Sequence, residues 1–396
     1  MVDSNPRSGN PSHAEASPAQ TKRALKYGGG PSDYVKHALE AVAQPYKGIT
    51  TDGTVIPALF PIQKTGVSTQ SVREAAEDFL GSLNPEQRAK TLFPIDTDEW
   101  RKWSNIHRLL MRHGMPLFEM NDAQRDRAFA LLRECLSTQG FETARDVMRL
   151  NETVMEMTGK FDEYGEDLYW LSIMGKPSAS VPWGWQIDGH HLIINYFVLG
   201  DQITMTPTFL GSEPVFAQGG KYAGTRVFKA EEELGLTVIR ALNAEQRSKA
   251  VLSLDLPREL FTSAFRDNIE LRYEGIPYGR LSSAQHDLLL RLIELHVGRI
   301  RPGHAQVKME EVKRHLRETT FAWMGGMEED SVFYYRVHSP TIIIEFDHQR
   351  GIAFPQYQKP YKDHIHLVVR TPNGNDYGKD LLRQHYEQSH HSKQAV

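Results

Sequence analysis

The sequence contains a single cysteine, Cys135, among its 396 residues. One thiol excludes an internal disulfide framework and any site that needs two cysteine ligands from the same chain. Cys135 lies within a helical pattern, and we interpret it as a small core residue rather than a nucleophile.

The sequence also lacks long apolar runs and concentrated positive charge. No run approaches the roughly 18 apolar residues of a membrane-spanning helix, and the first residues lack the apolar segment of a secretory signal. Lys and Arg total 46 against 50 Asp and Glu, for a net charge of -4. Nucleic acid and anionic membranes are therefore not expected as partners. We expect a soluble, cytoplasmic protein that acts on a small molecule.

The composition is that of a globular chain, with 40% hydrophobic and 24% charged residues. Three segments differ from this average. Residues 1–30 are rich in Ser, Pro and Gly, which predicts a disordered tail. Residues 31–67 contain a short helical pattern after Ser32 and then several prolines, which predicts an extended arm. Residues 388–396 are expected to fray after a closing helix.

Four helix starts share one pattern, an Asn or Ser followed three residues later by Gln. This is the spacing of a capping box, in which each side chain bonds the backbone of the other residue. The four boxes form two pairs of similar spacing, and each pair precedes a strand-rich block: Asn84–Gln87 with Asn121–Gln124, and Asn243–Gln246 with Ser282–Gln285.

The two strand-rich blocks can be laid over one another. Trp183 falls on Phe333, and the run that starts at Leu192 falls on the run that starts at Ile342. The blocks close with Thr206-Pro207 and Thr371-Pro372. We therefore predict an α+β fold of two pseudo-repeated halves, 68–230 and 231–387. Each half is a helical segment followed by a mainly antiparallel sheet, and the site is expected between the sheets.

Two strands carry histidines in a pattern that a structural strand does not need. The dipeptide His190-His191 precedes a continuous apolar run, and His364 and His366 alternate along another strand. Since side chains alternate between the faces of a strand, His364 and His366 share one face. We predict a metal site with these four histidines as candidate ligands. His190 would reach the site only if Gly189 formed a bulge.

Acidic and basic residues on neighbouring segments extend the candidate site. Glu345 and Asp347 share a strand face, and either could be a further ligand or a general base. Arg336 and Arg370 flank these strands, where an arginine can hold a carboxylate or phosphate. The aromatic residues at 183, 185, 334 and 335 either line a pocket or belong to the core.

Nitrogen and oxygen ligands without sulfur suit a divalent zinc, iron, manganese or copper ion, and we favour zinc. Such an ion lowers the pKa of bound water towards about 7, which favours hydrolysis of a small anionic or aromatic molecule. Three alternatives remain open: an iron- or copper-dependent oxidoreductase, a metal-free acid–base enzyme, and a protein that binds a small ligand without catalysis.

Several of these motifs occur together in an order that resembles a known family. They include Trp183-Gly-Trp185, Gly189-His-His191, Thr206-Pro-x-Phe209-x-Gly211, His364-Ile-His366 and Asp376-Tyr-Gly378. The chain resembles, over about residues 70–387, the family catalogued as domain of unknown function 3500. The resemblance implies no activity, but it implies that the histidines are family motif positions and that the first 70 residues are an addition.

Overall fold

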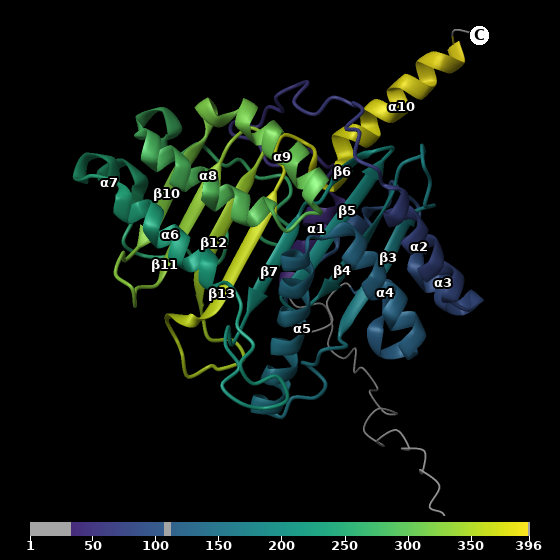
Figure 1. Cartoon of the computed structure of the whole chain (residues 1–396), viewed down its shortest axis with the longest axis horizontal. Helices are drawn as coiled ribbons and strands as arrows, with labels where there is room; N and C mark the ends of the chain where they lie inside the picture. The colour runs from purple at the N-terminus through teal and green to yellow at the C-terminus, as the bar shows by residue number, and fades with distance from the viewer. Residues whose placement is uncertain (1–32, 107–111, 395–396) are drawn as a thin grey trace, which may run out of the picture. The chain divides into compact units, whose positions relative to one another are not determined.

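In the computed structural model, which describes residues 33–106 and 112–394, the described strands belong to one sheet of 13 strands (Figure 1). The strands are β1 (Leu92–Phe93), β2 (Met115–Pro116), β3 (Tyr169–Gly175), β4 (Trp183–Gly189), β5 (Leu192–Leu199), β6 (Gln202–Thr204), β7 (Thr208–Ser212), β8 (Val251–Ser253), β9 (Ile276–Pro277), β10 (Thr320–Gly325), β11 (Phe333–His338), β12 (Ile343–Arg350) and β13 (Pro360–Arg370). The expectation of two sheets is therefore wrong, because the two strand blocks join edge to edge in one sheet.

The strands follow one another in a similar order from each edge of the sheet to the middle, as β1-β3-β4-β5-β7 from one edge and β8-β10-β11-β12-β13 from the other. The full order runs β1-β3-β4-β5-β7-β13-β12-β11-β10-β8, with β2 paired to β3, β6 to β5 and β9 to β10. The only parallel pairs among the described strands are β1 with β3 and β8 with β10, at the two edges. The central pair, β7 and β13, is antiparallel and joins the two blocks.

Each of the four predicted capping boxes begins a helix, and the described residues form ten α-helices in all. They are α1 (Asp33–Ala43), α2 (Gln70–Ser82), α3 (Pro85–Thr91), α4 (Asp122–Cys135), α5 (Thr138–Thr158), α6 (Lys229–Ala241), α7 (Ala244–Ala250), α8 (Ser283–Val297), α9 (Pro302–Arg314) and α10 (Lys379–Gln394). The closing helix α10 continues to Gln394, so it extends into the segment expected to fray. The predicted tail at residues 1–30 lies outside the described residues.

All four predicted capping boxes are present, at the starts of α3, α4, α7 and α8. Their glutamines have a second role. The side-chain amide of Gln124 donates to that of Gln87 at 2.8 Å, and the amide of Gln285 donates to that of Gln246 at 2.8 Å. Each pair of boxes thus holds two helix starts together, by the same contact in both parts of the chain.

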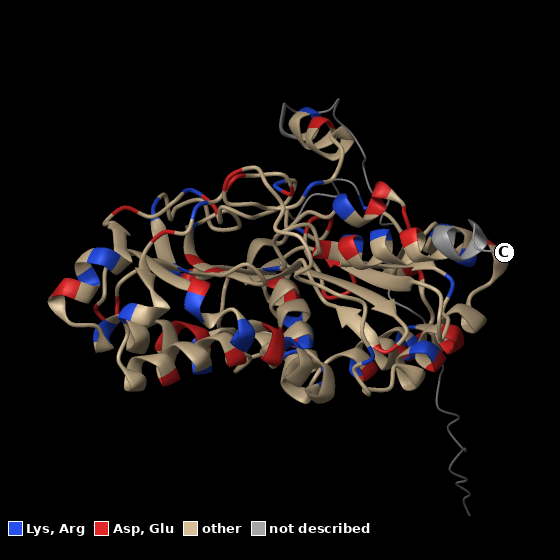
Figure 2. Cartoon of the chain, turned by 90° about the horizontal axis from the view of Figure 1, so that it is seen from above, with Lys and Arg blue, Asp and Glu red and all other residues tan. Residues whose placement is uncertain are grey.

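One face of the sheet is covered by helices, and the other is covered mainly by loops, together with α1 and the start of α10 (Figure 2). On the helical face, alternate strand residues such as Trp185, Tyr335 and Leu367 pack with apolar residues of α2, α4, α5, α6, α8 and α9. On the opposite face, which we call the loop face, Phe209 and Tyr334 pack against residues 100–103 and 260–264. No helix of the described residues is long and apolar enough to cross a membrane.

The two Thr-Pro dipeptides do not occupy corresponding positions. Thr206 precedes β7 and Thr371 follows β13, and because these strands are antiparallel the two threonines meet at the same end of the pair. The hydroxyl of Thr206 lies 2.8 Å from that of Thr371. The dipeptides are therefore neighbours across the central pair rather than repeats of one position.

Candidate metal centre

Three of the four candidate histidines converge on the loop face, where β13 meets the turn between β4 and β5. The Nε2 atoms of His364 and His366 are 3.0 Å apart, and those of His191 and His366 are 3.1 Å apart. The third distance, between His364 and His191, is 3.4 Å. All three side chains are buried, and 5% or less of each residue is exposed. The three imidazoles could hold one metal ion.

His191 reaches the other two because of an unusual turn. Gly189 and Leu192 are paired across β4 and β5, so His190 and His191 are the two residues of the turn. His191 has a φ of 63°, the left-handed region that non-glycine residues seldom adopt but that histidine tolerates better than most. Its carbonyl accepts a hydrogen bond from the Gly211 amide at 2.8 Å, which ties the turn to β7.

Gly211 makes room for the convergence. It lies opposite His366 in the β7–β13 register. A Cβ at this position would lie 2.8 Å from Cδ2 of His366 and 2.9 Å from Cδ2 of His191. Glycine is therefore needed here for the close approach of two rings rather than for backbone conformation. The sequence placed Gly211 in a motif but did not indicate this role.

The hydrogen bonds of His364 and His366 determine which ring nitrogen carries the proton. His364 Nδ1 lies 2.7 Å from the carbonyl oxygen of Arg350, which can only accept, so Nδ1 is the donor. His366 Nδ1 lies 3.2 Å from a carboxylate oxygen of Glu259 and is a donor as well. In the neutral rings both Nε2 atoms then carry a lone pair, and these lone pairs face one another.

Lone pairs at this separation repel unless a cation lies between them. A single proton would remove the repulsion between only one pair of nitrogens, whereas a metal ion can contact all three nitrogens together. Zinc–nitrogen bonds of about 2.0–2.1 Å place two tetrahedral ligands roughly 3.3 Å apart and two right-angled ligands roughly 3.0 Å apart. The three observed separations cover this range. Burial, and then the proximity of His366, lower the pKa of His364 well below its usual value, which keeps the His364 ring in the neutral form that binds metals.

Two carboxylates that sequence reasoning missed lie behind the candidate ligands His364 and His366. Glu259 accepts from His366, and Glu213 lies 3.5 Å from Nδ1 of His364. Glu213 also accepts from the Ile352 and Ala353 amides and the Tyr361 hydroxyl, which fixes the loop after β12. A carboxylate behind a metal-bound histidine orients the ring and raises its basicity. Two negative charges would also balance a buried divalent cation.

Glu345 and Asp347 share a strand face, as predicted, and this is the loop face, but they differ in role. Glu345 accepts from the backbone amides of Phe261 and Thr262 at 2.9 and 2.8 Å, and also from the hydroxyls of Thr262 and Tyr334. It anchors the covering loop and has no capacity left for a metal. The Asp347 Oδ1 is buried without a hydrogen-bond partner among the described residues. Burial, and then Glu259, raise the Asp347 pKa well above its usual range.

The two arginines bind protein groups instead of facing the histidines. Arg370 donates to Asp376, to Asp267 and to the Thr262 carbonyl at 2.7, 2.6 and 2.9 Å. Arg336 donates to Glu274 at 2.7 Å. The expectation that they hold an anionic group of a substrate therefore has no geometric support. Their role in the structure is to fix the loops that cover the sheet.

The remaining predicted residues lie outside the three-histidine group. The ring of His190 stacks on that of His191 with centroids 3.8 Å apart, and its Nδ1 is 2.8 Å from Asn151 Oδ1 on α5. It packs against the candidate ligand His191 and does not reach the three converging nitrogens. The aromatic residues belong to the core, three of them on the helical face (Trp183, Trp185 and Tyr335) and one on the loop face (Tyr334).

Comparison with known proteins places this arrangement in a family. A model described as "Protein of unknown function (DUF3500)" matches residues 65–379, which include the whole sheet and all three histidines. No curated protein and no solved structure matches the chain. The match covers well over half of the sequence, and the chain belongs to the DUF3500 family of proteins of unknown function.

Proposed function

We propose that this protein is a metal-dependent enzyme in which His191, His364 and His366 hold one divalent ion. The observation that carries the proposal is the convergence of three Nε2 atoms within 3.4 Å of one another, two of them with their lone pairs directed inwards. A structural network would direct at least one N–H of each close pair at an acceptor. The carboxylates behind His364 and His366 add further support.

Zinc is the favoured ion. Three imidazoles that leave one position open are the ligand set of hydrolytic and hydrating zinc sites, whereas magnesium and calcium prefer oxygen ligands. Iron, manganese and copper also accept imidazole ligands. Among the described residues, the side chains that converge are three imidazoles, without a carboxylate or a thiolate. This ligand set suits an ion of intermediate softness, such as zinc, rather than a hard or a soft metal ion.

Hydrolysis is the favoured reaction, because a bound divalent ion lowers the pKa of water towards about 7. The protein residues would exclude bulk solvent and hold the three rings in place. The centre is deeply buried, and the Phe209 ring lies 5.1 Å from that of His366. These surroundings favour a small, apolar or aromatic substrate. Since Arg336 and Arg370 bond to protein carboxylates, an anionic substrate has less support.

An assay of metal-reconstituted protein tests this function. Protein stripped with a chelator would receive zinc, manganese, iron(II) or copper(II) in turn, with 4-nitrophenyl acetate as substrate. We expect hydrolysis that rises with zinc up to one equivalent and that His191→Ala abolishes. The control is His37→Ala, which removes an exposed histidine on α1. Oxygen uptake with iron or copper, without hydrolysis, would favour the oxidoreductase. Metal binding without either reaction would favour a binding protein.

We also infer that the two parts of the chain are halves of an internal duplication. Support comes from the matched glutamine contacts, from the parallel edge pairs and from the strand order that mirrors itself about β7 and β13. The first half contributes one of the three histidines, and the second half contributes the other two. A symmetric precursor would thus have acquired one asymmetric site at the junction, where ligand sites often form.

A further inference from the structure

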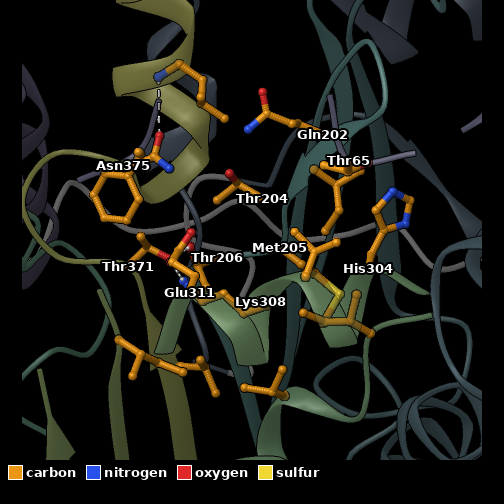
Figure 3. Close-up of a pocket in the computed structure, with 18 of the residues that line it drawn as sticks. Thr65, Gln202, Thr204, Met205, Thr206, His304, Lys308, Glu311, Thr371 and Asn375 are labelled. Atoms are coloured by element: carbon orange, nitrogen blue, oxygen red, sulfur yellow. Dashed lines mark hydrogen bonds and ion pairs between the residues drawn. The ribbon is translucent and has the colours of Figure 1, made fainter. Parts of the chain in front are cut away.

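A cavity of about 60 Å³ lies on the helical face of the sheet, behind the strands that carry the histidines (Figure 3). Thr208 and Val369, which line it, alternate along β7 and β13 with the residues of the loop face. The other walls come from residues 202–206 around β6, from α8 and α9, and from residues 60–65 of the N-terminal arm. The cavity is thus separate from the proposed metal centre.

The arm is a fixed wall of this cavity. The side-chain oxygen of Gln202 accepts from the Gln63 amide at 2.6 Å, and its nitrogen donates to the Pro61 carbonyl at 3.1 Å. Asp201 accepts from the Thr65 amide at 3.0 Å. These hydrogen bonds hold the arm in place, so the cavity is a built feature rather than a gap beneath a loose segment.

The lining offers more hydrogen-bonding groups than the protein uses. Thr206, Thr371 and Asn375 lie together on one side of the view in Figure 3. Thr206 donates its hydroxyl proton to Thr371, so the proton of Thr371 remains for another acceptor. Asn375 Oδ1 accepts from the Leu381 amide, which leaves its NH₂ group. Thr204 lines the same cavity. Such a set suits a ligand with several oxygen atoms.

The charges that line the cavity favour an anion. Lys308 donates to Glu311 at 2.6 Å and to the Thr341 carbonyl at 2.8 Å, and Arg299 is paired with Glu231, so these charges are balanced. Arg314, at the exposed rim, has no ion pair within the described part of the chain. The positive charge of Arg314 is therefore available to an anionic ligand.

The geometry points to a second ligand site, for a small hydroxylated monocarboxylate. Its carboxylate would face Arg314, and its hydroxyl groups would bond Thr204, Thr371 and Asn375. One water needs about 10–15 Å³ of such space, so the cavity accommodates roughly four to six water-sized groups, which is close to the size of a three-carbon hydroxy acid such as glycerate.

Saturation-transfer NMR and calorimetry with glycerate test the proposal. Glycerol, which lacks the carboxylate, and propionate, which lacks the hydroxyls, are the comparison probes. We expect glycerate to bind with a dissociation constant of about 1 mM or tighter and both comparison probes to bind at least tenfold more weakly. Equal binding of the three compounds, or no binding of glycerate at about 10 mM, would overturn the proposal.

Matched variants locate the binding. Thr204→Val removes one hydroxyl at constant shape and should weaken glycerate binding about fivefold, the value of one hydrogen bond. Arg314→Gln should also weaken it, whereas Arg317→Gln, three residues away and exposed, should not. Binding must persist in the His364→Ala/His366→Ala variant. Binding that survives Thr204→Val and Arg314→Gln unchanged, or that disappears with the histidines, would contradict a separate site.

Discussion

Gly211 lies opposite His366 in the central strand pair, and a Cβ at position 211 would come within 2.8 Å of the His366 ring and 3.0 Å of the Ile365 carbonyl. The absence of one side chain on β7 therefore allows a ring from β13 and a ring from the β4–β5 turn to approach each other. The proposed metal centre thus depends on a residue that would contribute no ligand.

The Gly211→Ala substitution should weaken metal binding without unfolding the protein. The added methyl group must displace His366 or His191, at an expected loss of about 1–3 kcal/mol in the free energy of unfolding of the metal-free protein. We expect metal affinity to fall about tenfold or more, measured by competition with a chromogenic chelator. Gly219→Ala is the control, because a Cβ there meets no atom within 4 Å. Unchanged affinity in Gly211→Ala would show that the rings are not held as described.

Glu259→Gln tests the carboxylate behind His366. Glutamine retains an oxygen that can accept from Nδ1 but removes the charge, so the ring becomes less basic. Substitution of such partners lowers metal affinity about 10- to 100-fold, and the same titration measures it. Glu270→Gln, which removes a carboxylate that accepts no hydrogen bond from these histidines, should leave the affinity at the wild-type value. If the Glu259→Gln variant bound metal as tightly as wild type, Glu259 would have no role in metal binding.

The Glu345→Gln variant tests whether Glu345 stabilises the fold or binds the metal. Glu345 accepts two backbone amides and two hydroxyls from the covering loop and from β11, and an NH₂ group in place of one oxygen leaves buried donors without an acceptor. We expect a loss of roughly 2–4 kcal/mol in the free energy of unfolding, measured by urea denaturation. Metal content per folded molecule should not change. A stable variant that lacks metal would instead return Glu345 to the ligand set.

These contrasts show what the sequence could and could not predict. Strand alternation was enough to place His364 and His366 on one face, and the capping boxes identified four helix starts. Alternation does not reveal which loops cover a face. Glu259 lies in a proline-containing segment without periodicity, and the partners of Arg370 lie in a loop 103 residues away and in the turn after its own strand. Contacts of this kind depend on loop paths, which local patterns do not encode.

Glu213 and Gly211 could have been found from their setting. Both fall in the stretch directly after Thr206-Pro207, where a glycine within a strand indicates close approach of another group. Glu213 is an acidic residue next to the end of that strand, and this position could have identified it as a partner of the histidines. His190, in contrast, shares its motif with His191, and only the left-handed conformation of His191 decides which ring reaches the site.

The stability of the metal-free protein should decrease in mild acid. Burial lowers the pKa of His338 to about 3 and that of His296 well below its usual value. In the unfolded chain both rings take up protons near pH 6.5. Below this pH the unfolded state binds more protons, so the stabilising contribution is complete above about pH 6.5 and is lost progressively as the pH falls.

Urea denaturation in the presence of a chelator measures this dependence. Wild-type protein should lose stability steadily between about pH 6.5 and pH 5, and His338→Asn should reduce the slope by about 1.4 kcal/mol per pH unit, the value for one proton. His37→Ala, at an exposed position, should retain the full slope. A His338→Asn slope equal to that of wild type would mean that His338 does not remain neutral in the folded protein.

The central claim is that three buried imidazoles hold one metal ion. Inductively coupled plasma mass spectrometry of purified, untagged protein tests it directly, beside the His364→Ala/His366→Ala variant whose folding is verified by circular dichroism. We predict close to one equivalent of zinc, or of another divalent ion from the same group, in wild type and none in the folded variant. No bound metal in wild type, even after exposure to zinc, manganese, iron and copper, would contradict the claim.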